Sequence, residues 1–321
     1  MRALLAPLLV GSVGCGLGLA DDTSGGRTDL PRTGAGPWQK LPADDATPLE
    51  EPLVAVDQIL EYTEPALLAD GDGYLLFVTR EPADAPVGDT AIWRAELPAL
   101  DALTTAPALT QVLVADQAWE GGRVGAPALV DLGDRLVLFY AGVDAIGRAE
   151  STDRGRTWTK GAAPVVTGAT SPGVAFDGAR WLLAFVDGDG AIGLASSDDG
   201  LTFTPAAAPI LTARADDPDA FDHALVGAPS LAWLVEGTGR GHFALWYAGA
   251  PEVPRGEDRP EWAIGYAASW DGATWSRLDG NRPVARAPTE APAVILDGNR
   301  GVMAFAAPSG RRSAIGLATS R

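Results

Sequence analysis

Two glutamates stand beside prolines that lead into similar apolar runs of the chain. Glu64 comes directly before Pro65, and Glu290 comes two residues before Pro292. Two carboxylates flanking a glycosidic bond are the minimum for acid–base hydrolysis, because one must hold a proton while the other is ionised. The same pair can also hydrogen-bond sugar hydroxyls. Glu64 and Glu290 are therefore the first candidate catalytic residues.

A second set of candidates precedes two other apolar runs of the same kind. Trp119-Glu120 and Phe221-Asp222-His223 lie in the same register before Pro127 and Pro229. Loops on one face of a rigid scaffold commonly carry function, so Asp222 is the candidate third catalytic acid. The candidate substrate contacts are Trp119, Glu120, Arg123, Ser171, Phe221 and His223. The alternative is that these acids cap turns while the aromatic rings pack between sheets; His242, the other histidine, is expected to begin a strand.

A repeat dictates the elements that must position these residues. The pattern Ala-Ile-x-x-Ala occurs five times, at 91–95, 145–149, 191–195, 263–267 and 314–318. Each copy lies downstream of a proline-led apolar run, with another strand-like run between them. A period of roughly 40 to 60 residues with four strands per unit is typical of propeller blades. We therefore predict an all-β fold, a single five-bladed β-propeller of four-stranded antiparallel blades.

The outermost strand of the last blade is not supplied by the C-terminal end. Outer strands are predicted at 111–114, 164–166, 209–211 and 283–285, but the fifth repeat ends without one. Residues 51–56 have the same pattern and are expected to pair with the strand around Ile315, which would close the ring and cover its edge. Innermost strands line the funnel of a propeller, so Glu64 and Glu290 are expected to face each other at its mouth.

The first 48 residues differ in composition from the remainder. Arg2 and the apolar stretch 3–10 are typical of a signal peptide over residues 1–20. Cys15, the one cysteine, stands in a segment that resembles the lipobox of bacterial lipoproteins, which implies lipidation there; simple cleavage after Ala20 is the alternative. Residues 21–48 are predicted to be a disordered tether, and residues 49–321 the propeller. We expect an exported envelope lipoprotein, or otherwise a periplasmic or secreted protein.

The net charge of −18 argues against nucleic acid as a partner, since phosphates would be repelled. It also argues against adsorption to anionic lipid, so membrane contact is expected only through the N-terminal lipid. No cofactor is expected, and the acidic segment 216–219 is interpreted as a solvated loop and not as a metal site. A monomer with a carbohydrate ligand is the expected state.

Three segments, 151–158, 196–203 and 269–275, resemble the Asp boxes of sialidases, in which Asp and Gly shape a tight turn. With five blades and the segment 264–275, the chain from residue 52 onward resembles the glycoside hydrolases of families 32 and 43. That resemblance implies three carboxylates, in the first three blades. Glu64 occupies the first position, but Ala126 and Ser171 occupy the others. A sialidase is disfavoured, since Arg123 is the one arginine near a repeated proline.

Three functions remain open on this evidence. The first is a carbohydrate-binding protein with weak or no catalysis. The second is a glycoside hydrolase acting through Glu64, Glu290 and a loop acid. The third is a protein-interaction scaffold, which would present an apolar or flat face.

Overall fold

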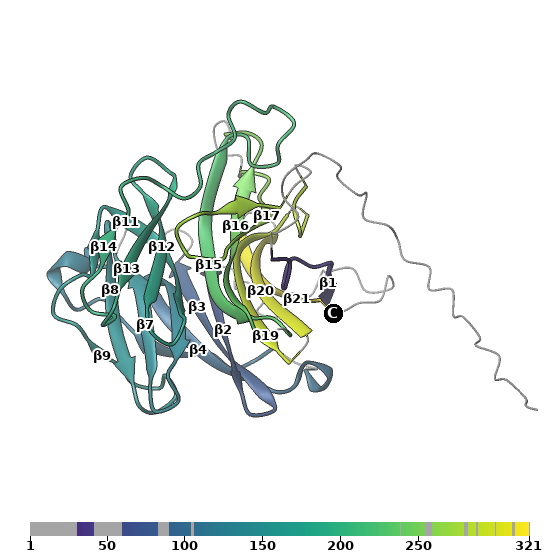
Figure 1. Cartoon of the computed structure of the whole chain (residues 1–321). Coiled ribbons are helices and arrows are strands. Elements are labelled where there is room, and N and C mark those ends of the chain that lie inside the picture. Colours follow the sequence, from purple (N-terminus) through teal and green to yellow (C-terminus); the bar gives the residue numbers. More distant parts are fainter. Residues whose placement is uncertain are drawn as a thin grey trace, which may run out of the picture.

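In a computed structural model of the protein, five antiparallel sheets stand around a common axis, and their innermost strands contact one another in a cycle (Figure 1). The structure describes residues 31–41, 60–82, 90–103, 106–237, 239–253, 259–278, 282–286, 288–298, 300–309 and 312–320. Within these ranges the only helices are two single 3-10 turns, η1 (Leu100–Ala102) and η2 (Ala118–Glu120). The predicted five-bladed all-β propeller is confirmed.

Each blade uses consecutive strands, except the fifth, which borrows β1 from the N-terminal part of the chain. From the axis outward, blade I contains β2 (Leu60–Asp70), β3 (Gly73–Pro82), β4 (Ala91–Leu97) and β5 (Thr110–Leu113), and blade II contains β6 (Gly125–Asp131), β7 (Leu136–Ala141) and β8 (Ala145–Ser151), with both β9 (Thr159–Lys160) and β10 (Val166–Thr167) paired to β8. Blade III contains β11 (Ala169–Phe176), β12 (Trp181–Asp187), β13 (Ile192–Ser197) and β14 (Thr204–Pro205), and blade IV contains β15 (Leu225–Val235), β16 (Gly241–Ala250), β17 (Ala263–Ser269) and β18 (Ser276–Arg277). Blade V contains β19 (Glu290–Asp297), β20 (Arg300–Ser309), β21 (Arg312–Ser320) and β1 (Trp38–Leu41).

The repeated isoleucine explains why the third strand of every blade is buried. All five of these side chains have no exposed surface: Ile92, Ile146, Ile192, Ile264 and Ile315. A strand covered by blades on both faces must be apolar on both. Burying one such side chain stabilises the fold by about 1.5–3 kcal/mol relative to leaving it exposed.

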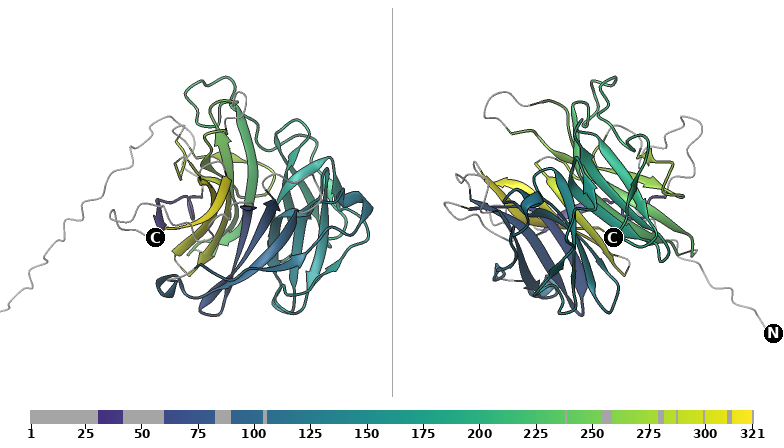
Figure 2. Two further views of the ribbon diagram at one scale, coloured as in Figure 1. Left: turned by 180° about the vertical axis from the view of Figure 1, so that it is seen from behind. Right: turned by 90° about the vertical axis from the view of Figure 1, so that its left-hand side faces the viewer.

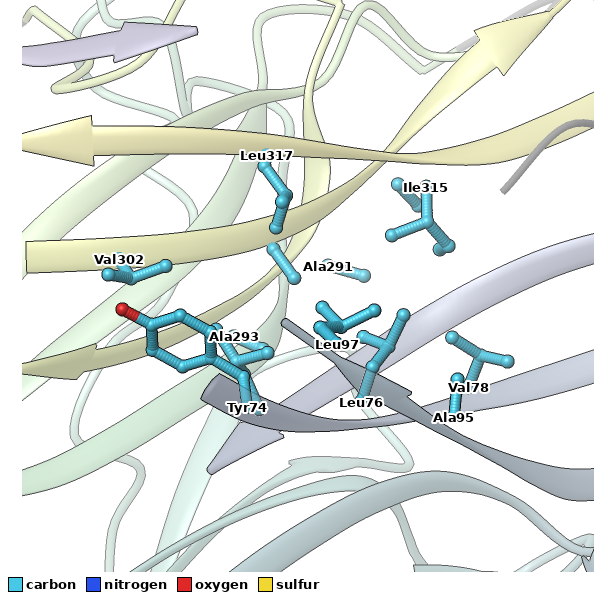
Figure 3. Close-up of a cluster of buried hydrophobic side chains, with 13 residues drawn as sticks. Tyr74, Leu76, Val78, Ala95, Leu97, Ala291, Ala293, Val302, Ile315 and Leu317 are labelled. Atoms are coloured by element: carbon cyan, nitrogen blue, oxygen red, sulfur yellow. The ribbon is translucent and has the colours of Figure 1, made fainter. Parts of the chain in front are cut away.

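The core lies between neighbouring sheets. Figure 3 shows the cluster between blades V and I, where Leu76 and Val78 of β3 face Ile315 and Leu317 of β21. The hydroxyl of Tyr74, also in this cluster, donates a hydrogen bond of 2.7 Å to Asp297 of β19. This packing joins the first and last blades of the ring.

The ring is closed by a different segment from the one predicted. Trp38–Leu41 pairs antiparallel with β21, with Trp38 opposite Ser320 and Leu41 opposite Leu317. In Figures 1 and 2 the purple β1 lies beside the yellow β21, near the C-terminus. The prediction that 51–56 fills this place is therefore wrong, although closure by an N-terminal strand is confirmed. Residues 51–56 lie outside the described residues.

Three turns share one hydrogen-bond pattern. In the first, Asp153 accepts hydrogen bonds from the Ser151 hydroxyl and from the backbone N–H groups of Arg156 and Thr157. The second uses Ser197 and Asp199, so it is one residue shorter than a motif beginning at Ser196 implied. The third uses Ser269 and Asp271. These hydrogen bonds hold the pKa of Asp199 and of Asp271 at about 2.

Candidate functional site

Each innermost strand contains the same irregularity near its start. The residue before each repeated proline has a positive φ between 44° and 48°: Glu64, Ala126, Ser171, Ala228 and Ala291. The strand pairing shifts by one residue at the same place in all five blades. Such bulges re-aim side chains, and left-handed backbone at a residue other than glycine stores strain, which is concentrated at functional sites.

These bulges surround a central cavity of about 450 Å³, lined by the innermost strands of all five blades. We call this cavity the funnel. Most of its lining residues are Ala, Pro, Val and Leu, together with Ser171, Ser230 and Trp233. Among the described residues that line it, Glu64 is the one with a charge.

The Glu64 side chain accepts hydrogen bonds from residues of both blade I and blade II. Its Oε2 accepts a hydrogen bond of 3.0 Å from the Thr79 hydroxyl and one of 3.1 Å from the backbone N–H of Ala126. Its Oε1 accepts no hydrogen bond from the described residues. The Glu64 side chain is 24% exposed, so one oxygen is fixed while the carboxylate still reaches the funnel.

Glu290 begins β19, across the junction between blades V and I. Its Oε1 accepts a hydrogen bond of 3.1 Å from the Ser313 hydroxyl. Burial raises the pKa of Glu64, and the charge of Glu290 adds a smaller effect in the same direction. Glu64, however, lines the funnel, whereas Glu290 is not one of its lining residues.

Two arginines flank this pair, each anchored to another glutamate of blade I. Arg123 lies 2.6 Å from Glu81 and 4.0 Å from Glu64. Arg259 lies 3.0 Å from Glu61. Glu61 and Glu81 are directly opposite each other in β2 and β3, a pairing of like charges that is unfavourable unless cations offset it. The arginines supply that compensation.

Burial raises the pKa of three of these glutamates. For Glu64, loss of water outweighs the lowering effects of Arg123, Thr79 and the Ala126 N–H group. For Glu290, it outweighs the Ser313 hydrogen bond and the charge of Arg259. Burial likewise raises the pKa of Glu81 despite the nearby Arg123. A carboxyl with a raised pKa retains its proton at higher pH, so this group can donate as well as accept hydrogen bonds.

Glu120 is not at the funnel. It is fully buried within blade II, where its carboxylate accepts hydrogen bonds from the Tyr140 hydroxyl at 2.8 Å and from Lys160 at 2.5 Å. The backbone N–H groups of Asp116 and Gln117 donate to its other oxygen. Trp119 packs beside Tyr140, with ring centroids 5.8 Å apart.

Asp222 has the equivalent position in blade IV. It is fully buried and accepts hydrogen bonds from Arg214 at 2.6 Å and from the Tyr247 hydroxyl at 2.8 Å, while Arg277 lies 3.2 Å away. Phe221 packs beside Tyr247 at 5.9 Å. We call this arrangement, in blades II and IV, the acid plug: an acid bonded to a tyrosine of the second strand and a cation of the fourth. The structure does not bring Asp222 to Glu64 and Glu290.

The histidines also lie apart from the funnel. His223 Nδ1 is 3.0 Å from the Asp217 carbonyl and 3.1 Å from the Arg214 carbonyl, within the loop before β15. His242 is the second residue of β16, as expected, and is fully buried against Trp270. Burial lowers the pKa of His242, which favours its neutral form.

The structure thus places Arg123 beside Glu64, with Glu290 at the start of β19 in the neighbouring blade and Ser171 elsewhere on the funnel wall. It separates the four residues Trp119, Glu120, Phe221 and Asp222 from the funnel. The supporting residues Thr79, Glu81, Ser313 and Arg259 were not predicted from the sequence. Thr79 and Glu81 follow the apolar run 75–78 within β3, and pairing β2 with β3 would have placed Glu81 beside Glu61. No signal in the sequence connects Arg259 to Ser313.

Two further properties concern the described ranges alone. These ranges contain no group of three His, Cys, Asp or Glu side chains arranged to hold a metal ion. None of their helices is long and apolar enough to span a membrane. Cys15 and the predicted signal peptide lie outside the described residues.

No protein-family model matches the sequence, and no curated protein matches it. Solved structures do match the fold. A glycosyl hydrolase from Bacteroides ovatus has a TM-score of 0.66 and 16% identity, over 90% of this chain and 95% of that one. The catalytic domain of the Coprinopsis cinerea GH62 α-L-arabinofuranosidase has a TM-score of 0.63 and 12% identity, over 84% and 95%. A complex of BT0996 with RGII has a TM-score of 0.63 and 16% identity, over 84% of this chain and 89% of that one. This chain therefore has the five-bladed propeller fold found in glycoside hydrolases.

Proposed function

We propose that the protein binds carbohydrate at the mouth of the funnel, with Glu64 and Glu290 hydrogen-bonded to sugar hydroxyls. One observation carries the proposal: the single charged residue on the funnel wall, Glu64, has one oxygen fixed and the other without a partner among the described residues. A concave site with a few convergent polar groups is the usual form of a ligand site. Structural neighbours that are glycoside hydrolases, and a further neighbour solved in a complex with RGII, support carbohydrate as the ligand class.

Weak glycoside hydrolysis is the second candidate function. It is favoured by the raised pKa of both Glu64 and Glu290, since a protonated carboxyl beside an ionised one can serve as general acid and base. Ala126 and Ser171 occupy the corresponding positions in blades II and III, so a third acid is lacking there. We therefore expect binding to exceed turnover.

A glycan array and a panel of chromogenic glycosides test both functions on the purified protein. Glu64→Gln and Glu290→Gln should each weaken glycan binding about tenfold, the effect of one charge-assisted hydrogen bond. Asp134→Asn is the matched control, because Asp134 is an exposed acid on the β6–β7 turn. Unchanged binding in both glutamine variants would refute the site, and Glu120 and Asp222 would then be tested.

We also propose that the protein is exported and anchored by lipid at Cys15, and that the folded part is a monomer. The apolar segment 3–10 and the position of Cys15 behind it support export and lipidation. The expected result is that Cys15→Ser moves the protein from the membrane fraction to the soluble fraction. A wild-type protein that is already soluble outside the cytoplasm would instead favour cleavage after Ala20.

We propose that the three Asp-box-like turns are structural and do not bind ligand. In the first, Asp153 uses both carboxylate oxygens within the turn, since Thr157 donates to Oδ2 from its hydroxyl and to Oδ1 from its backbone N–H group. The ring of Trp158 packs edge-on against Phe77 at 6.0 Å. These contacts support a role in holding blades together.

A further inference from the structure

Thr79 determines which oxygen of Glu64 is free. Thr79 is fully buried, and its Oγ1 accepts a 2.7 Å hydrogen bond from the backbone N–H of Ala126. A hydroxyl has one proton, so the O–H of Thr79 is left to donate to Glu64 Oε2 at 3.0 Å. The Ala126 N–H group also approaches the same oxygen, at 3.1 Å. With two donors directed at it, Oε2 must be an acceptor, and any proton on Glu64 belongs on Oε1.

Ser313 does the same for Glu290. Its side chain is buried, and its Oγ accepts a 2.7 Å hydrogen bond from Arg259 Nη1. The hydroxyl proton of Ser313 is therefore directed to Glu290 Oε1, at 3.1 Å. Glu290 Oε2 accepts no hydrogen bond from the described part of the chain. In both cases an N–H group fixes a hydroxyl, and the hydroxyl fixes one carboxylate oxygen.

We infer that Thr79 and Ser313 are positioning residues, each of which keeps one oxygen of its glutamate as an acceptor and reserves the other, Oε1 of Glu64 and Oε2 of Glu290, for the ligand or for a proton. This inference deepens the proposed function, because it names the two atoms that sugar hydroxyls would meet. The hydroxyls belong to different strands, β3 and β21, so each glutamate is controlled separately.

Because each glutamate is positioned by a different hydroxyl, the inference can be tested without a ligand. Because the Thr79 hydroxyl stabilises the ionised form of Glu64, Thr79→Val should strengthen proton binding at Glu64 about tenfold and leave Glu290 nearly unchanged. Ser313→Ala should have the opposite selectivity. Thr79→Ser and Ser313→Thr keep the hydroxyl and should behave like the wild type. Carboxyl ¹³C shifts followed with pH report each glutamate in protein labelled with [δ-¹³C]glutamate, and Glu64→Gln and Glu290→Gln assign the signals.

Thr289→Val is the matched control, because it also removes a buried hydroxyl close to Glu290. Thr289 is as buried as Ser313 and directly precedes Glu290, but its hydroxyl donates to the carbonyl of Arg286 at 3.2 Å. We expect Thr289→Val to leave proton binding at Glu290 unchanged. Equal effects of Ser313→Ala and Thr289→Val, or no effect of Thr79→Val on Glu64, would overturn the inference. Failure of Thr79→Val to fold would leave the Ser313 variants as the deciding test. A protein that shows these shifts but binds no glycan would refute the proposed function alone.

Discussion

Glu64 is the one charged residue at a position that is alanine or serine in the other four blades. It combines a left-handed backbone, a partly buried carboxylate and a raised pKa, all of which cost stability at pH 7. Sites that lower stability without a packing role are typical of function. The strain at the five bulges is common to every blade, but the charge is confined to blade I.

The raised pKa of Glu64 predicts a specific effect on stability. The folded protein binds the Glu64 proton more tightly than the unfolded chain does, so protonation of Glu64 stabilises the folded state. This contribution is complete below pH 4.5 and is lost as the pH rises through the folded-state pKa. Glu64→Gln, whose amide oxygen can still accept from Thr79, should therefore raise the free energy of unfolding at pH 7 by about 1 kcal/mol. Urea unfolding at pH 7 and pH 4 measures this. A variant less stable than wild type at pH 7 would contradict it.

At the scale of elements, the acid plugs show what the sequence can and cannot reveal. The recurrence of an aromatic residue and an acid at 119–120 and 221–222 is visible in the chain, and it marks a repeated structural feature. The direction in which each acid side chain points is not visible in the sequence. Whether Glu120 faces the funnel or the blade depends on Tyr140 and Lys160, which are 20 and 40 residues further on and meet it only in the folded blade.

Breaking one acid plug should damage the blade and spare the funnel. Lys160→Met leaves the fully buried Glu120 without its cation, which should cost about 3 kcal/mol. Adding Glu120→Gln removes the uncompensated charge and should recover part of that loss. Chemical unfolding of the wild type, both single variants and the double variant gives the coupling energy. Purely additive effects would contradict a direct interaction between Glu120 and Lys160.

The order of blades, by contrast, followed from local signals. Five copies of one buried pattern place each third strand, and the repeated prolines place each first strand. The position of Glu64 on the funnel could be predicted in this way. Thr79, Ser313 and Arg259 could not, because their contacts with the glutamates join different strands or different blades.

For the whole molecule, residues 31–41 join the last two blades. The Trp246 indole N–H donates to the Gly34 carbonyl at 2.9 Å, and the Tyr266 hydroxyl donates to the Thr33 carbonyl at 3.0 Å. The chain then passes from blade IV to blade V, where β1 covers the edge of β21. The sequence pattern placed residues 51–56 at this edge, whereas β1 occupies it. The position of β1 goes with the contacts of residues 33 and 34 with blade IV, which local patterns do not encode.

Truncation tests this closure. Deleting residues 1–30 should leave the midpoint of thermal unfolding nearly unchanged, because residues 31–41, which the structure anchors to blades IV and V, are retained. Deleting residues 1–41 removes β1 and exposes the β21 edge, so the midpoint should fall by several degrees and aggregation should increase. Equal midpoints for the two truncations would show that β1 is dispensable.

The position of a bound sugar tests the central claim most directly. A crystal structure of the protein with the glycan that binds best on the array should show sugar hydroxyls within hydrogen-bonding distance of Glu64 Oε1 and Glu290 Oε2, at the mouth of the funnel. Glu64→Gln crystals treated in the same way should show lower occupancy there. A glycan bound elsewhere on the ring, with both glutamates free of it, would contradict the account.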